Sequence, residues 1–166
     1  PTGSNGDCDN NGVCDKNTES CLSCPSDCSC CHGYWAAGNH KVSEASNAEG
    51  KPDNKFATLS GTGVLVFAMG EAIVNQTGDD FRILGSIQAG STGKITVSAK
   101  DTLTNATGEY KQVGTWTGVG TKSAGFDVGH VQFSGGTSIS EIMLEATEGI
   151  VAKIDAIESI TCKNKP

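Results

Sequence analysis

The sequence predicts an all-β fold, a two-sheet jelly-roll sandwich that follows a small cysteine-rich appendage. Seven of the eight cysteines lie within residues 8–31, and glycine is abundant whereas aromatic residues make up only 5% of the chain. From about residue 38 onward, short apolar segments alternate with Gly, Asn, Asp and Thr turns, a spacing typical of sandwiches and barrels. A chain of 166 residues suffices for one ordinary domain, expected at residues 34–166, and the appendage, expected at 1–33.

The appendage has too few hydrophobic side chains to form a core, since Val13 and Leu22 are the only aliphatic residues within 8–31. We expect disulfide bonds to replace that core. Zinc at Cys21 and Cys24 is the weaker alternative, because Cys30 and Cys31 are adjacent and the surroundings are acidic. An even number of crowded cysteines indicates an oxidising compartment, so we expect a secreted, extracellular protein at a cell surface. The cysteines expected in disulfides are Cys8, Cys14, Cys21, Cys24, Cys28, Cys30, Cys31 and Cys162.

Oxygen-bearing side chains surround Gly12 within the appendage, in the pattern D-x-D-x-N-G-x-x-D. Alternating oxygen ligands and a glycine at a sharp turn resemble a calcium loop, although Thr18 stands where an EF-hand has its last ligand. Solvated acidic residues in a turn are the alternative. The segment NNGVCDKNTESCLSCPSDC also resembles a short cysteine-rich repeat of prokaryotic surface proteins, which implies a surface location. The expected calcium ligands are Asp7, Asp9, Asn11, Asp15 and Glu19.

Nine short segments are expected to be the strands of the sandwich. In residues 94–100, apolar Ile95, Val97 and Ala99 alternate with polar residues, which predicts a strand with one wet face. Residues 63–69 have no polar face and are expected to be buried. The full set is 56–59, 63–69, 71–74, 80–85, 94–100, 109–114, 130–134, 140–146 and 152–160.

The segment SEASNAEGKPDNKFATLSGTGVLVFAMGEAIVNQTGDDFRILG, together with KIDAIESI near the end, resembles the galactose-binding-like, discoidin-type jelly roll of prokaryotic surface proteins. The resemblance implies a calcium ion where the loop after the first strand meets the last strand, so we expect one or two calcium ions in the whole chain. It also implies that the first and last strands lie side by side, and that Cys162 bonds Cys30 or Cys31. The implied calcium ligands are the Asn47 carbonyl, oxygens near Glu49 and Asp53, Thr58, and the Glu158 side chain.

Charge and motifs argue against several functions. A net charge of -7 and a single arginine, Arg82, are unfavourable for binding nucleic acid. No apolar run is long enough to span a membrane, and no nucleophile or metalloprotease motif accompanies the three histidines, so we expect a non-enzyme. The triplets at Asn75 and Asn105 are potential glycosylation sites in surface loops.

Two functions remain after these exclusions. The expected function is a structural subunit of a cell-surface fibre, sheath or array, in which the disulfide-stapled appendage drives head-to-tail self-association into a polymer. The alternative is a calcium-containing carbohydrate-binding module, with aromatic residues stacked on sugar rings and polar groups that hold hydroxyls. Its candidate sugar contacts are Trp116, Tyr110, Arg82 and His130, although a tryptophan in such a sandwich is more often part of the core.

Overall fold

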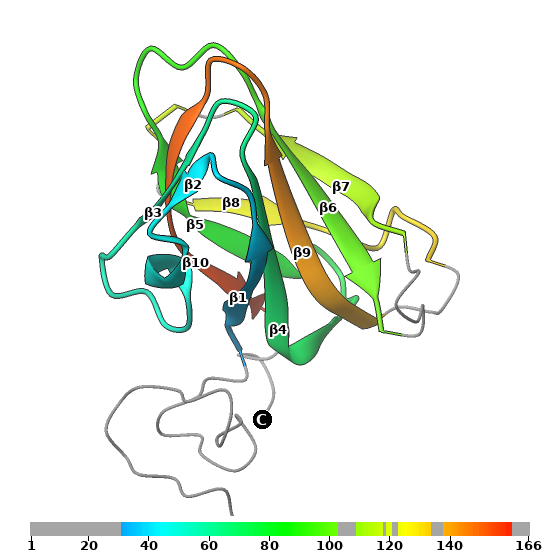
Figure 1. Cartoon of the computed structure of the whole chain (residues 1–166). Helices are drawn as coiled ribbons and strands as arrows, with labels where there is room; N and C mark the ends of the chain where they lie inside the picture. The colour runs from blue at the N-terminus through cyan, green and yellow to red at the C-terminus, as the bar shows by residue number, and fades with distance from the viewer. Residues whose placement is uncertain (1–30, 103–108, 118, 121–122, 134–137, 161–166) are drawn as a thin grey trace, which may run out of the picture.

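The computed structural model describes residues 31–102, 109–117, 119–120, 123–133 and 138–160. It confirms the predicted sandwich: two antiparallel five-stranded sheets pack face to face, with orders β1-β4-β9-β6-β7 and β2-β3-β10-β5-β8 (Figure 1). The strands are β1 (Gly33–Gly38), β2 (Val42–Ser43), β3 (Ala57–Ser60), β4 (Val64–Val74), β5 (Phe81–Ile87), β6 (Ile95–Asp101), β7 (Lys111–Trp116), β8 (Ser123–Phe126), β9 (Ser138–Ala146) and β10 (Val151–Ser159). A short 3-10 helix, η1 (Ala45–Ala48), precedes β3.

The core lies between the sheets, and alternate residues of β3 and β5 are buried in it. Ile95, Val97 and Ala99 of β6 are fully buried, as the alternation predicted. The opposite face is not fully wet, because Ser98 on it is only 4% exposed. In β4, Leu65 and Phe67 are fully buried as well, and Val66 on the opposite face is 8% exposed. The apolar run in β4 is therefore buried on one face and largely covered on the other.

Two predicted strands differ from the structure. Residues 71–74 do not form a strand of their own but continue β4, whose pairing with β9 shifts register between Ala68 and Ile73. The expected strand at 130–134 was wrong over its described part, because residues 130–133 follow a turn and adopt no strand. The edge strand is β8 instead, where Phe126 stacks on Phe81 of β5 with ring centroids 5.4 Å apart.

The last strand, β10, lies in the middle of its sheet and pairs with both β3 and β5. Its end also meets the start of the described chain, because His32 forms a bridge with Glu158 and the Ser159 amide donates to the Cys31 carbonyl at 2.7 Å. Cys31 is disulfide-bonded. The appendage before it and Cys162 lie outside the described residues.

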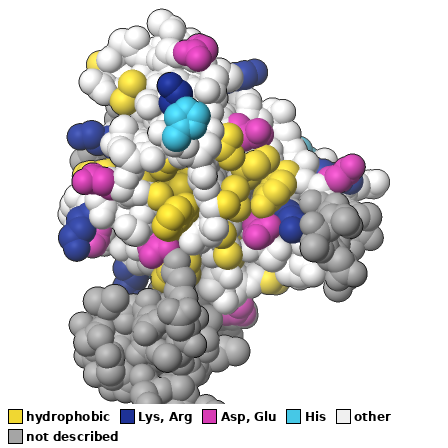
Figure 2. Space-filling model, viewed as in Figure 1, with side chains coloured by type: hydrophobic (Ala, Val, Ile, Leu, Met, Phe, Trp, Pro, Cys, Tyr) yellow, Lys and Arg dark blue, Asp and Glu magenta, His cyan; other side chains and the backbone are white. Residues whose placement is uncertain are grey.

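The outer face of the β1-β4-β9-β6-β7 sheet faces the viewer in Figures 1 and 2, and hydrophobic side chains gather near its middle. The same sheet also carries charged and polar groups. Tyr110 donates a hydrogen bond to Glu141 of β9, and Glu141 also forms an ion pair with Lys100 of β6. Among the described residues, no helix has the length and apolar character needed to cross a membrane.

Candidate functional site

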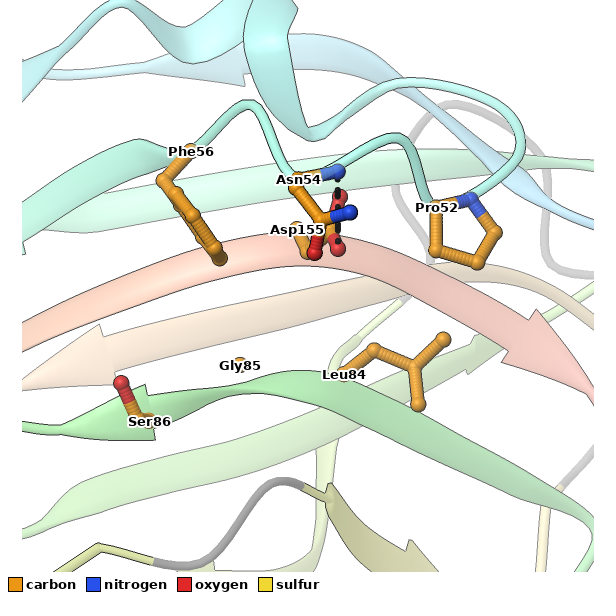
Figure 3. A pocket seen from close by; sticks show the side chains of 7 residues that line it. All are labelled: Pro52, Asn54, Phe56, Leu84, Gly85, Ser86 and Asp155. Carbon is orange, nitrogen blue, oxygen red and sulfur yellow. Dashed lines mark hydrogen bonds between the residues drawn. The ribbon is translucent and has the colours of Figure 1, made fainter.

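A groove runs along the outer face of the other sheet, between β5, β10 and the loop at residues 51–56. Its cavity measures about 440 Å³, which lies within the usual range for small-molecule sites. In Figure 3, Phe56 stands at one end, Pro52 at the other, and Asn54 and Asp155 between them. The lining residues are Pro52, Asn54, Phe56, Leu84, Gly85, Ser86 and Asp155.

One carboxylate holds the loop in place over the sheet. Asp155 Oδ1 accepts the amide of Asp53 at 3.1 Å. Its Oδ2 accepts the amide of Asn54 at 3.4 Å, a bond drawn in Figure 3. The loop turns sharply because Asn54 adopts a left-handed conformation with φ of 62°, which asparagine tolerates better than most residues. Asp53 Oδ1 accepts the Lys55 amide and closes the turn. A carboxylate from β10 thus shapes the upper wall of the groove.

A glycine forms the floor of the groove. The pairing of β10 with β5 shifts register between Ile154 and Ala156, so Asp155 lies at a bulge. A Cβ added to Gly85 would lie 2.2 Å from the Lys153 carbonyl oxygen, which is backbone and cannot move aside. Only glycine therefore fits where the two strands approach so closely.

The chemistry of the groove is mixed, with apolar ends and a polar centre. The half-buried Phe56 ring has the Lys153 ammonium 5.9 Å from its centroid. Asp155 is 8% exposed, and each of its oxygens keeps lone-pair capacity beyond the amide it already accepts. Ser86 adds a hydroxyl on the β5 side. Such a groove suits a ligand with both apolar faces and hydroxyl groups.

A buried ion pair lies further along the same sheet. Glu158 of β10 is 1% exposed, and its Oε2 accepts from Arg82 Nε at 2.6 Å. The Arg82 Nη2 atom also contacts Oε2, while Glu158 Oε1 lies 3.2 Å from His32 Nε2. Both carboxylate oxygens are thus engaged by cationic or imidazole nitrogens, at the point where the chain enters β1.

The structure does not bring together the five calcium ligands that the resemblance implied. Thr58 lies opposite Lys153, five residues before Glu158, which separates their backbones by about 16 Å at ordinary strand rise. This is too far for both side chains to bind one ion. Elsewhere, Glu49 Oε1 accepts the Trp35 amide, Asn47 Nδ2 donates to the Phe56 carbonyl, and the Asp53 carboxylate pairs with Lys55. Calcium at a subset of these residues stays a prediction.

The four candidate sugar contacts do not gather at one site either. Trp116 is 3% exposed and belongs to the core, so its expected role as a stacking platform was wrong. Tyr110 lies by Glu141 on the outer face of one sheet, and Arg82 lies by Glu158 on the other. His130 is exposed in the turn after β8. The groove residues Phe56 and Asp155 were not identified from the sequence as ligand contacts.

Several predicted sites fall outside the described residues. They are the calcium loop at Asp7, Asp9, Asn11, Asp15 and Glu19, every cysteine except Cys31, and the potential glycosylation site Asn105. The other glycosylation triplet begins at Asn75, just after β4, where the side-chain oxygen is buried.

The chain matches no protein-family model and no curated protein sequence. Among solved structures, it resembles a family 6 carbohydrate-binding module (TM-score 0.42, 11% identity, 75% of this chain and 86% of that one). It also resembles the family 29 carbohydrate-binding module CBM29_1 from Piromyces equi, with a TM-score of 0.44 and 11% identity. The match covers 82% of this chain and 92% of that module. A glycoside hydrolase family 43 arabinoxylan arabinofuranohydrolase from Bacillus subtilis, in complex with cellotetraose, scores 0.37 at 19% identity over 71% of this chain and 23% of the hydrolase. Scores this low assign no family.

Proposed function

We propose that this protein binds carbohydrate in the groove between β5, β10 and the loop at residues 51–56. The observation that carries the proposal is the combination of a half-buried aromatic ring, Phe56, with a carboxylate, Asp155, in one cavity of about 440 Å³. Sugar rings present apolar faces of C–H groups and edges of hydroxyls, so they match an aromatic surface beside hydrogen-bond acceptors.

The groove is built before any ligand arrives, which favours binding. Asp155 is fixed by two backbone amides, and the loop that carries Phe56 is tied to η1 through Asn47. A preformed site loses less conformational entropy on binding than a mobile one. The lining contributes a single carboxylate, whereas glycoside hydrolysis ordinarily uses two. We therefore propose binding without catalysis.

The proposal places the protein outside the cell, where the disulfide at Cys31 is stable. The three solved structures described above are also two carbohydrate-binding modules and a glycoside hydrolase, but their low similarity adds no argument. The fibre subunit expected from the sequence depends on the appendage, most of which lies outside the described residues. Head-to-tail self-association therefore stays a prediction.

The test is electrophoresis of the full chain through native gels that contain soluble xylan, β-glucan, galactan or galactomannan. Retardation by one polysaccharide should disappear in Phe56→Ala and should weaken at least tenfold in Asp155→Asn, which loses the charge and one of the two oxygens that accept the loop amides. Tyr110→Ala is the matched control, because it removes a part-exposed aromatic residue just before β7 of the opposite sheet. Equal retardation of Phe56→Ala and the unaltered protein would place any sugar site elsewhere.

A further inference from the structure

A second cluster of polar side chains lies where the loop between β4 and β5 meets the chain after β8. Its centre is Asp80, which is fully buried. The Asp80 Oδ1 atom accepts the Gln76 amide at 2.7 Å, and Oδ2 accepts the Val128 amide at 2.9 Å. This carboxylate therefore ties together two loops that lie about 50 residues apart in the chain.

A second carboxylate lies beside the first. Burial raises the pKa of Asp80, the amides of Val128 and Gln76 oppose that rise, and Asp127 adds to it through its negative charge and a side-chain hydrogen bond. Within the described part of the chain, neither carboxylate forms an ion pair with Lys or Arg. Two acidic side chains thus lie together without a described cation to compensate them.

The third member of the cluster is the side-chain amide of Asn75. Its Oδ1 atom is buried and has no hydrogen-bond partner, an arrangement that costs free energy in a folded protein. The oxygen faces the same small space as Asp127: a Cβ added to Gly129 would lie 2.7 Å from Asn75 Oδ1 and 2.9 Å from Asp127 Oδ1. Because residue 129 is glycine and has no side chain, it leaves this space unfilled.

We propose that Asn75 Oδ1 and the carboxylates of Asp80 and Asp127 bind a divalent cation, with Ca²⁺ the best match. All three groups offer oxygen, and Ca²⁺ binds carboxylates and amide carbonyls in flexible geometry with water in the remaining positions. Two carboxylates balance its charge. The ion gives the Asn75 oxygen the partner it lacks and removes the repulsion between the two acids.

This site is separate from both sets of calcium ligands predicted from the sequence. It shares no residue with the loop at residues 7–19 or with the set that ends at Glu158. It would join the chain after β4 to the chain after β8, so that the ion and Asp80 cross-link the same two loops. The glycan-binding groove does not depend on it.

The test uses the full chain, produced in a bacterial host so that Asn75 carries no glycan, and stripped of metal with EDTA. Addition of Ca²⁺ should shift the NMR amide resonances of Gly129, whose N–H donates to Asp127 at 2.6 Å, and of Val128, whose N–H donates to Asp80. Calorimetry should show that Asp127→Asn loses one equivalent of Ca²⁺ or binds it at least tenfold more weakly. Glu148→Gln, which removes an exposed acid from the turn before β10, should leave the stoichiometry unchanged.

An opposite orientation of the Asn75 amide would satisfy the same atoms without an ion, with Nδ2 donating to Asp127. In that case the Asn75 side-chain N–H resonances of the metal-free protein would exchange slowly, and millimolar Ca²⁺ would leave Val128 and Gly129 unmoved. That result would overturn the proposal, and it needs only the unaltered protein. Equal Ca²⁺ stoichiometry for the unaltered protein and a folded Asp127→Asn would overturn it as well.

Discussion

Replacement of Glu158 by glutamine should destabilise the fold substantially. The carboxylate is buried, holds Arg82 through two nitrogens and contacts His32. Glutamine keeps the shape but loses the charge, so the charged interaction with Arg82 is replaced by a weaker neutral hydrogen bond. The change therefore weakens the buried polar link that joins β10 to Arg82 of β5 and to His32 before β1.

The size of the effect follows from the exposure of the partners. Removal of one member of a fully buried ion pair costs about 3–5 kcal/mol. The Arg82 side chain is 42% exposed, so water replaces part of the lost interaction and the expected loss falls to about 2–3 kcal/mol. In a protein of this size, such a loss lowers the melting temperature by about 4–12 °C.

Thermal and urea unfolding, with and without Ca²⁺, test this expectation. The control is Glu145→Gln, which removes a part-exposed acid from β9, and a double-mutant cycle with Arg82→Met isolates the pair. A loss below about 0.5 kcal/mol, or additive effects of Glu158→Gln and Arg82→Met, would refute the reasoning. A loss that appears only with Ca²⁺ present would instead support Glu158 as a calcium ligand.

Three further outcomes are expected. Peptide mapping without reduction should link Cys31 to Cys162, since Cys31 is disulfide-bonded and its carbonyl accepts the Ser159 amide. Loss of this disulfide in Cys162→Ser should lower the free energy of unfolding by about 4–5 kcal/mol before strain. A Cys162 that is freely alkylated in the native protein would contradict the link. Burial, the hydrogen bond to Glu141 and the Glu141 charge raise the pKa of Tyr110 above its ordinary value of 10.0, so the stability from this hydrogen bond is complete below pH 10 and is lost as pH rises further. Ultraviolet titration should show that Tyr110→Phe removes the latest tyrosinate step, and an unchanged curve would refute this. Gly85→Ala should destabilise the protein by several kcal/mol in urea unfolding, because its Cβ would meet the Lys153 carbonyl; a stable variant would show that β5 and β10 are less closely packed.

Alternation of polar and apolar residues is a local pattern, and it predicted most strands of the sandwich. It worked for β6 because Ile95, Val97 and Ala99 share one buried face. It failed at residues 130–133, where apolar Val131 and Phe133 pack against the core from a loop rather than from a strand. Partly buried loops carry apolar residues too, so short apolar segments alone do not identify a strand.

The groove and the ion pair could not be predicted in the same way, since both depend on contacts between distant segments. Asp155 acts on residues 53 and 54, about 100 positions earlier, and Glu158 meets Arg82 and His32 through strand pairing. The only local indication of the groove was a lone carboxylate within the apolar segment KIDAI. The burial of Trp116 could not be predicted from the sequence either, because the glycines that flank it are compatible with a loop or with a strand.

The central position of β10 has a consequence for how the chain reaches its folded state. Both neighbours, β3 and β5, are synthesised long before it, and until residues 151–159 leave the ribosome they have no partner on that side. Two open strand edges, prone to pairing with other chains, therefore persist until β10 is synthesised. Insertion of β10 closes both edges in one step and completes the groove at the same moment, so the groove exists only in chains whose two edges are already paired.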